Sequence, residues 1–248
     1  MSTIIKAENI GIKFSLGKKG YKKMQLTLGD VLKKGNQVRS TDDNSYDFWA
    51  LRNVSFTINK GDILGVVGSN GSGKSTLLRI IAGVYSVDEG EIEVSGTISP
   101  LLSLGTGFKP ALSGYDNIFL NGVIMGFQKH EIEEHVKDII EFSELGNFIF
   151  EPVKNYSSGM AARLGFSIAV FLKRDIMLID EVLGVGDYKF REKSQQKMRE
   201  VIKSGQTVII VSHNLESISE YANKCIWINK GELVMEGDTD EVLKKYVS

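Results

Sequence analysis

The clearest chemical signal in the chain is a short run of glycine, serine, asparagine and lysine. It reads Gly68-Ser69-Asn70-Gly71-Ser72-Gly73-Lys74-Ser75-Thr76. The run matches the pattern of glycine, four residues, then glycine, lysine and serine, in which backbone N–H groups turn inward around phosphate. In such a loop the lysine reaches the β- and γ-phosphates of a nucleotide, and the serine hydroxyl binds Mg²⁺. We therefore expect the run to hold a nucleotide, Lys74 to be catalytic and Ser75 to bind the metal.

The residues on either side supply the structure that such a loop needs. The apolar run Ile63–Val67 predicts a buried strand, and residues 76–82 predict a helix whose N-terminus adds partial positive charge. The alternative is a glycine-rich turn without a ligand. That alternative gives no reason for a lysine and a serine at the point where the helix begins.

Two neighbouring acids follow a second buried strand. Ile176–Ile179 is apolar throughout, so Asp180 and Glu181 lie at its carboxyl end, where ligands bind in α/β proteins. We expect Asp180 to hold Mg²⁺, directly or through water. Glu181 lies on the other face of the pleat, where it could act as the base for an attacking water or orient it. Alternatively, the two acids cap a helix.

A third feature is the polar segment Tyr156-Ser157-Ser158-Gly159-Met160, which precedes an apolar helix. Backbone N–H groups and the Ser157 hydroxyl could form a second anion site at this helix N-terminus. Serine and glycine also cap ordinary helices, so both interpretations of this segment stay open.

The first part of the chain surrounds the loop with strands. Residues 4–14 predict an edge strand. Residues 50–67 predict a β-hairpin in which Val54–Ile58 pairs with Ile63–Val67. Further strands are expected within residues 91–102.

Helical patterns take over in the middle of the chain. Residues 103–172 predict an inserted helical subdomain, with helices at 113–125, 131–142 and 159–172. Strands and helices then alternate, which predicts a largely parallel sheet with covered faces. The expected elements are strands at 176–179 and 207–211, helices at 190–203 and 215–222, and a closing hairpin at 225–236.

Composition narrows the function classes. The 248 residues carry a net charge of −1, which gives no sign of a nucleic-acid partner. Cys225 is the one cysteine, so no intrachain disulfide can form, as in proteins of a reducing compartment. No uncharged apolar run approaches the ~20 residues of a membrane-spanning helix. Any association with a membrane is therefore expected to be peripheral.

Residues 15–48 have the character of a basic insertion. Within residues 16–41 of this insertion, seven basic residues accompany one acid, Asp30. The basic residues are Lys18, Lys19, Lys22, Lys23, Lys33, Lys34 and Arg39. The insertion is either a solvated loop or a patch that meets an anionic membrane surface or a partner.

In their order along the chain, these motifs resemble those of the nucleotide-binding subunit of an ABC transporter. The resemblance covers nearly the whole chain and includes the phosphate loop, Tyr156–Met160, Ile179–Glu181, Gly184–Asp187 and Val211–His213. It implies a single ABC ATPase domain over residues 1–248. That domain would have an α/β P-loop NTPase core, an antiparallel β subdomain and an inserted helical subdomain, with ATP and Mg²⁺ as cofactors.

The resemblance also implies that two copies of the chain pair head to tail. Each ATP would lie between the phosphate loop of one copy and Ser157, Ser158 and Gly159 of the other. Asp187 would lie in the D-loop at the dimer contact.

Two further site residues follow from the resemblance. His213 looks like the switch histidine that contacts the γ-phosphate, and it joins Glu181 and Lys74 in the predicted catalytic set. Phe14 matches the aromatic position that stacks on adenine, with Trp49 as the weaker candidate.

A finer resemblance concerns the cargo. Leu101–Phe108 and Leu112–Ile118 look like segments of ABC subunits that export bacterial surface polysaccharides, such as O-antigen, capsular or teichoic acid polymers. It implies an ATP-hydrolysing subunit on the cytoplasmic face of the inner membrane, which meets a separately encoded transmembrane permease through residues 106–127. The alternatives are a soluble ABC ATPase that acts on nucleic acid or ribosomes, and a regulatory module without turnover.

Two positions depart from the family pattern. Ser103 or Leu104 stands where most ABC subunits carry a glutamine, so a contact to Mg²⁺ or water is missing there. Ser157–Met160 reads Ser-Ser-Gly-Met in place of the more common Ser-Gly-Gly-Gln, which makes the second phosphate site less glycine-rich. Some polysaccharide exporters continue into a carbohydrate-binding domain, and because this sequence stops at Ser248 we expect none.

Overall fold

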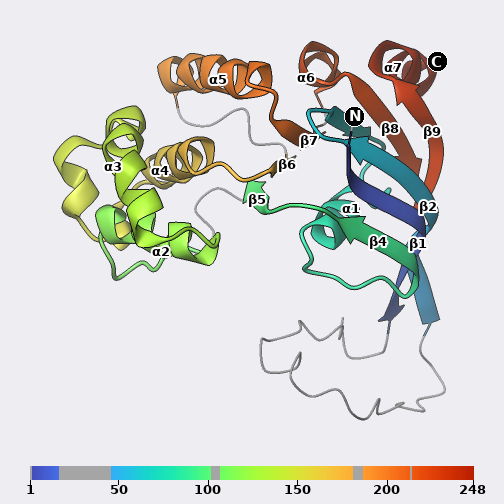
Figure 1. Ribbon diagram of the computed structural model, residues 1–248, viewed down its shortest axis with the longest axis horizontal. Helices are drawn as coiled ribbons and strands as arrows, with labels where there is room; N and C mark the ends of the chain where they lie inside the picture. The colour runs from blue at the N-terminus through green and yellow to red at the C-terminus, as the bar shows by residue number, and fades with distance from the viewer. Residues whose placement is uncertain (1, 17–45, 102–106, 181–186, 213) are drawn as a thin grey trace, which may run out of the picture.

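The computed structural model describes residues 2–16, 46–101, 107–180, 187–212 and 214–248. Figure 1 shows the β-sheets toward one end of the molecule and a lobe of helices at the other. Most of the basic insertion, residues 17–45, lies outside the described residues, as do Ser103 and Leu104.

The larger sheet carries the predicted parallel core. In the described part of the chain it has six strands in the order β5-β6-β7-β3-β8-β9. The strands are β5 (Ile98–Leu101), β6 (Ile176–Asp180), β7 (Thr207–Val211), β3 (Ile63–Val67), β8 (Lys224–Asn229) and β9 (Glu232–Asp238). Neighbouring strands are parallel except β8 and β9, which form the predicted closing hairpin.

The smaller sheet is antiparallel and has the order β2-β1-β4 among the described residues. Its strands are β1 (Thr3–Leu16), β2 (Tyr46–Asn59) and β4 (Glu89–Val94). The prediction of an edge strand at residues 4–14 is wrong, because β1 pairs on both sides. β4 is an edge instead, and its residues are exposed or half-buried.

The predicted hairpin over residues 50–67 is also wrong. β2 pairs with β1, whereas β3 lies between β7 and β8 in the other sheet. All residues of β3 are buried, as in a parallel strand covered on both faces. The turn between β2 and β3 therefore crosses between sheets. Asp62 fixes the crossing by accepting hydrogen bonds from the Asn59 backbone N–H at 2.8 Å and from Lys224 Nζ at 2.7 Å.

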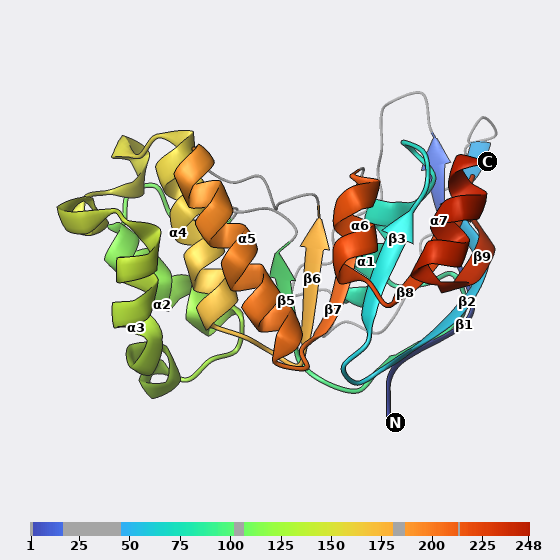
Figure 2. The same ribbon diagram turned by 90° about the horizontal axis from the view of Figure 1, so that it is seen from above.

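Two apolar cores cover the faces of the parallel sheet. The first lies between the two sheets and includes Leu77 and Ile81 of α1 (Lys74–Ile81). The second lies on the opposite face, under α5 (Tyr188–Lys203), α6 (Leu215–Tyr221) and α7 (Thr239–Val247). Figure 2 shows α6 and α7 along this face of the strands. Among the described strands, β6, β7 and β3 are therefore almost fully buried, whereas every residue of the edge strand β9 is exposed or half-buried.

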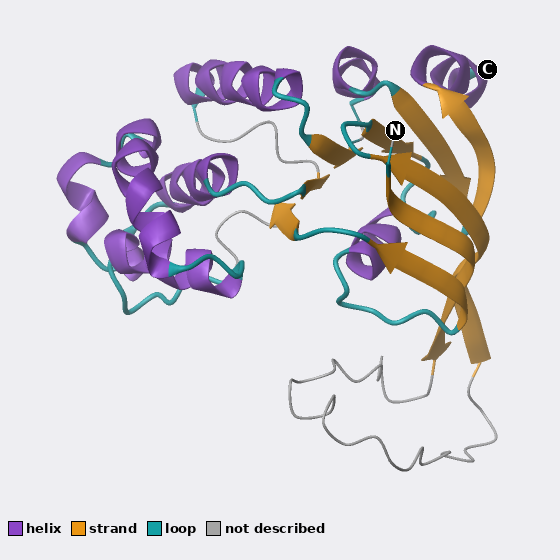
Figure 3. Cartoon of the chain, in the orientation of Figure 1, coloured by secondary structure: helices purple, strands orange, loops and turns teal. Residues whose placement is uncertain are grey.

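The helical subdomain forms the separate lobe, drawn in purple in Figure 3. It contains α2 (Gly114–Ile124), α3 (Lys129–Ser143), short 3₁₀ helices at Gly146–Phe150 and Val153–Asn155, and α4 (Ser158–Phe171). These bounds agree with the predicted helices to within two residues. The lobe has its own core, built from Ile118, Ile132, Ile139 and Leu164 among others.

None of the helices in the described residues is both long enough and apolar enough to cross a lipid bilayer.

Candidate functional site

The glycine-rich loop joins β3 to α1, in the strand–loop–helix order that the sequence predicts. Lys74 begins α1, and its side chain is largely buried, with the residue 6% exposed. Its ammonium Nζ donates hydrogen bonds to the backbone oxygens of Gly68 at 2.8 Å and Ser69 at 3.0 Å. The loop therefore wraps around the positive charge of its own lysine.

Two glycines in the loop are required by their surroundings. Gly68 has φ of 155°, and a Cβ there would lie 2.2 Å from the backbone oxygen of Ile228. Gly73 caps α1 with φ of 111°, and a Cβ there would lie 2.7 Å from the backbone oxygen of Ala50. The loop is thus held against β8 on one side and β2 on the other. By contrast, a Cβ at Gly71 would meet open space.

A cavity of about 580 Å³ opens above the loop. Residues predicted to bind nucleotide or metal line it: Phe14, Asn70, Gly71, Gly73, Lys74, Ser75, Thr76 and Asp180. Five other lining residues were not among the predicted site residues, namely Phe48, Ala50, Arg79, Tyr85 and Val211. Helical spacing could have found one of them, because Arg79 follows Ser75 by one turn and so shares its face.

Aromatic side chains form one wall of this cavity. The rings of Phe14 and Tyr85 meet edge to face, with centroids 5.7 Å apart. Phe48 lies opposite Phe14 in the β1–β2 register and is 52% exposed. The Arg79 guanidinium lies 5.9 Å from the centre of the Tyr85 ring. A flat apolar group could therefore stack on this wall and lie close to the cation of Arg79.

Trp49, the weaker candidate for adenine stacking, does not line the cavity. It follows Phe48 in β2, and successive strand residues point to opposite faces. Its ring lies near two cations instead, with Lys13 Nζ 5.7 Å and the Arg52 guanidinium 5.1 Å from its centre. The structure therefore separates Trp49 from the phosphate loop and keeps Phe14 beside it.

The predicted metal ligands lie in one cavity. Asp180 is the last residue of β6, is half-buried and pairs in register with Val211 of β7. Asp180, Ser75 and Lys74 all line the cavity above the loop. No group of three or more His, Cys, Asp or Glu side chains that could hold a metal occurs among the described residues. A carboxylate, a hydroxyl and phosphate oxygens fit Mg²⁺, which keeps several waters and needs few protein ligands.

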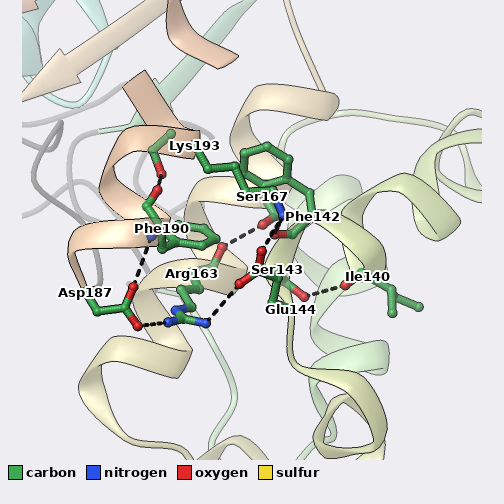
Figure 4. Close-up of polar contacts among 10 residues, drawn as sticks. Ile140, Phe142, Ser143, Glu144, Arg163, Ser167, Asp187, Phe190 and Lys193 are labelled. Carbon is green, nitrogen blue, oxygen red and sulfur yellow. Dashed lines mark hydrogen bonds and ion pairs between the residues drawn. The ribbon is translucent and has the colours of Figure 1, made fainter. Parts of the chain in front are cut away.

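Two predicted catalytic residues, Glu181 and His213, lie outside the described residues, as do Gly184–Gly186. Asp187 is described, and it begins the next helix. Its carboxylate accepts a hydrogen bond from the Phe190 backbone N–H at 3.0 Å and caps α5 (Figure 4). This contact is the largest cause of the lowered pKa of Asp187, and the nearby charge of Arg163 lowers that pKa further.

The predicted second anion site is the exposed N-terminus of α4. Ser157 caps the helix, because its Oγ accepts a hydrogen bond from the Met160 backbone N–H at 3.2 Å. A hydroxyl that accepts in this way can still donate its own hydrogen. None of the described residues that line the cavity comes from Ser157–Gly159. One copy of the chain therefore does not bring the two predicted phosphate sites together.

Comparison with known proteins agrees with this geometry. The family model described as ABC transporter matches residues 51–184, which include the loop, the start of α4 and the end of β6. The chain belongs to the ABC transporter family. The predicted family resemblance and the ABC cassette fold are thereby confirmed.

Three similar curated proteins carry the names of ATP-binding proteins of export systems. This ABC chain is 45% identical, over 98% of its length and 50% of the relative, to the teichoic acids export ATP-binding protein TagH of Lactococcus lactis. It is 45% identical, over 79% of its length and 45% of the relative, to the O-antigen export system ATP-binding protein RfbB of Myxococcus xanthus. The TagH of Staphylococcus haemolyticus is 47% identical, over 80% of this chain and 75% of that protein. The chain spans about half the length of the first two relatives.

Solved ABC structures share the fold at low sequence identity. The dimeric post-hydrolysis state of the ATP-binding cassette MJ0796, bound to ADP and Pi, superposes with a TM-score of 0.72 at 20% identity, covering 95% of this chain and 98% of that one. An ATP-binding subunit of an ABC transporter gives a TM-score of 0.74 at 16% identity, covering 98% and 93%.

Proposed function

We propose that this chain is the ATP-binding and ATP-hydrolysing subunit of an ABC transporter that exports a bacterial surface polysaccharide of the teichoic acid or O-antigen class. One observation carries the nucleotide part of the proposal. The phosphate loop, an aromatic wall and the half-buried carboxylate of Asp180 all line one cavity.

The lining of the cavity suggests how ATP lies in it. The triphosphate would lie along Gly71–Thr76, where backbone N–H groups, the α1 N-terminus and Lys74 favour negative charge. The adenine would stack on Phe14 at the aromatic wall. Because one cavity is lined by both the aromatic wall and the loop, a single ATP molecule could contact both.

Hydrolysis uses the carboxyl end of β6. Ser75 and Asp180 would hold Mg²⁺, which neutralises charge on the phosphates. Glu181, the next residue in the sequence, is our candidate for the base that receives a proton from the attacking water. His213, two residues after Val211 of the cavity lining, is our candidate for the γ-phosphate contact.

A second copy of the chain would complete each site. Ser157, Ser158 and Gly159 begin α4 away from the cavity of their own chain, and the exposed helix N-terminus is suited to phosphate. The similar cassette MJ0796 is dimeric in its solved structures. We infer a head-to-tail dimer in which the α4 N-terminus of one copy meets the ATP of the other.

The cargo is inferred from the relatives. Proteins that are 45–47% identical to this chain carry the names of teichoic acid and O-antigen export proteins. By this inference the chain works at the cytoplasmic face of the membrane, with a separate transmembrane permease that meets residues 106–127. The alternative of a soluble ATPase acting on nucleic acid is less favoured, because the net charge is −1 and these relatives are exporters.

Co-purification and phosphate release test the proposal together. Tagged full-length protein, isolated from the detergent-solubilised membranes of its own cells, should carry a polytopic membrane subunit and release phosphate from ATP. The Glu181→Gln variant should co-purify equally well and release almost none. Active protein that brings down ribosomes or nucleic acid instead would contradict the transport assignment, and full turnover in the variant would remove Glu181 from its role.

A further inference from the structure

The three rings of the aromatic wall come from three separate segments of the chain. Phe14 belongs to β1, Phe48 to β2 and Tyr85 to the loop that joins α1 to β4. The phosphate loop precedes the same helix α1. The loop that carries Tyr85 therefore links the phosphate side of the cavity to the wall where we place the base.

The backbone of Tyr85 is fixed to the last turns of α1. Its N–H donates a hydrogen bond to the backbone oxygen of Arg79 at 3.2 Å, and the N–H of Val84 donates to the same oxygen at 2.8 Å. The Arg79 guanidinium also lies 5.9 Å from the centre of the Tyr85 ring, within range of a cation–π contact. The position of Tyr85 is thus set by the helix that starts at the phosphate loop.

Asp88 fastens the other end of this loop to β1. Its backbone N–H donates to the backbone oxygen of Gly11 at 2.8 Å, and its carboxylate Oδ2 accepts a hydrogen bond from the Lys13 backbone N–H at 2.8 Å. The register between β1 and β4 ends at the pair of Gly11 and Glu89, so Asp88 extends the contact along β1. The strand is therefore held immediately before Phe14.

The rings of Phe14 and Tyr85 meet between these two anchors. Their centroids lie 5.7 Å apart and their planes are inclined by 74°, which is an edge-to-face contact. Both side chains are half-buried and pack against the core between the two sheets. An edge-to-face contact depends on ring orientation, because the positive edge of one ring meets the negative face of the other. Tyr85 therefore restricts the tilt of the Phe14 ring as well as its place.

We propose that Tyr85 is a positioning residue for the nucleoside part of ATP, because it holds the Phe14 ring at the angle at which adenine stacks on it. This inference rests on the proposed function. Tyr85 acts through Phe14, and the contacts to phosphate and Mg²⁺ are made by the loop and by β6. Without Tyr85 the Phe14 ring can turn, so stacking weakens while the phosphate contacts stay.

This role predicts an effect on nucleotide binding and not on the chemical step. Stacking on the base is the same before and during hydrolysis, and loss of such an interaction raises KM while kcat is unchanged. A variant that merely loosened the fold would lower kcat, because less of the protein would be active. The separation of KM from kcat therefore distinguishes positioning from a general structural role.

The full chain, purified with its membrane subunit, provides the test. Tyr85→Leu removes the ring but keeps an apolar side chain against the core. We expect it to raise the Kd for a non-hydrolysable ATP analogue and the KM for ATP by about three- to tenfold, with kcat within about twofold of wild type. Tyr85→Phe keeps the ring and should bind the analogue with nearly wild-type affinity.

A double-mutant cycle separates positioning from direct contact with the nucleotide. If Tyr85 acts through Phe14, its ring has no effect on affinity once the Phe14 ring is gone. Protein with Phe14→Ala and Tyr85→Leu together should therefore bind the analogue as weakly as protein with Phe14→Ala alone. A combined loss equal to the product of the two single losses would overturn the positioning role.

Tyr246→Leu is the matched control. Tyr246 of α7 meets Trp227 of β8 edge to face, with centroids 5.5 Å apart, and both side chains are half-buried. Neither ring lines the nucleotide cavity, so this variant loses a comparable contact and should keep wild-type Kd, KM and kcat.

A variant in the anchor gives a second measurement that leaves the Tyr85 ring in place. Asp88→Ala removes the carboxylate that accepts from the Lys13 N–H, and it should raise the Kd by less than Tyr85→Leu does. Should Tyr85→Leu not fold, wild-type affinity in Asp88→Ala would refute the inference.

Failure of the inference and failure of the proposed function give different results. Wild-type Kd in folded Tyr85→Leu would refute the positioning role and leave the proposed function intact. A wild-type complex that binds no ATP analogue would refute the proposed function, and the role of Tyr85 with it.

Discussion

Lys74 Nζ donates a hydrogen bond of 2.8 Å to the backbone oxygen of Gly68, the first residue of the loop that Lys74 closes. The contact joins the end of β3 to the start of α1 through a charged side chain. It holds the ammonium at the lining of the nucleotide cavity, beside Ser75 and Asp180. The lysine therefore shapes the loop and also faces the place where we put the triphosphate.

Removal of this lysine should weaken nucleotide binding more than it weakens the fold. Lys74→Ala removes the charge opposite the β- and γ-phosphates, and hydrogen bonds to charged groups contribute about 1.5–3 kcal/mol. We expect the Kd for ATP, measured by calorimetry, to rise by roughly tenfold or more. Lys245→Ala on the exposed side of α7 is the control and should bind normally. Equal affinity in the two variants would exclude Lys74 from the site.

The close packing behind the loop predicts an asymmetry between two glycines. Both Gly73 and Gly205 have positive φ, but only a Cβ at Gly73 would clash, at 2.6 Å from Leu51 Cδ2. Gly205→Ala should lower the free energy of unfolding only by the strain of the left-handed backbone, about 1–2 kcal/mol. Gly73→Ala should lower the free energy of unfolding by a further ~1–3 kcal/mol, because the added Cβ overpacks the site, and it should distort the loop. Urea unfolding measures both, and similar losses in the two variants would contradict the packing that we describe.

Adenine stacking should depend on Phe14 and not on Trp49. Phe14 lines the cavity beside Tyr85, whereas Trp49 lies near Lys13 and Arg52 on the other face of β2. Phe14→Ala should cost about 1–3 kcal/mol of ATP affinity, the usual range for base–aromatic stacking. Trp49→Ala should leave ATP affinity unchanged, even if the sheet becomes less stable. The reverse order of effects in an ATP titration would show that the adenine lies elsewhere.

The one cysteine should be unreactive in the native protein. Cys225 is fully buried in β8, and burial raises the pKa of its thiol to about 12 from an ordinary value of 9.0. The thiolate is the reactive form, so a thiol reagent at pH 8 should label Cys225 only when the protein unfolds locally or globally. Because the folded-state pKa is the higher one, the stability contributed by the neutral thiol is fully present below pH 9.0 and is lost as pH rises toward 12. Fast labelling without denaturant at pH 8 would contradict this burial.

Local signals in the sequence predicted the parts of the site that are contiguous in the chain. The loop, its strand and its helix follow from glycine positions and apolar runs within residues 63–82. Helices such as α3 follow from the helical spacing of their apolar residues. Phe14 was predicted only through the family resemblance, because nothing in its own neighbourhood distinguishes it from other strand aromatics.

The wrong or missing predictions concern contacts between residues that lie far apart in the sequence. Residues 54–58 and 63–67 suit a hairpin locally, but the burial of every residue of β3 places it in the parallel sheet, so the turn at Asp62 changes sheets. Phe48 lies at the cavity because of its register with Phe14, which the sequence does not encode locally. The Arg163–Asp187 pair joins two helices 24 positions apart and leaves no periodic signal.

In the proposed dimer, two copies of the chain clamp one ATP between separate half-sites. Protein carrying Asn70→Cys, mixed with protein carrying Ser158→Cys, tests it by cross-linking, since the buried native Cys225 does not compete. We predict a cross-link between the two proteins that forms with ATP and not without it. Absence of any such cross-link while ATP still binds would contradict the account.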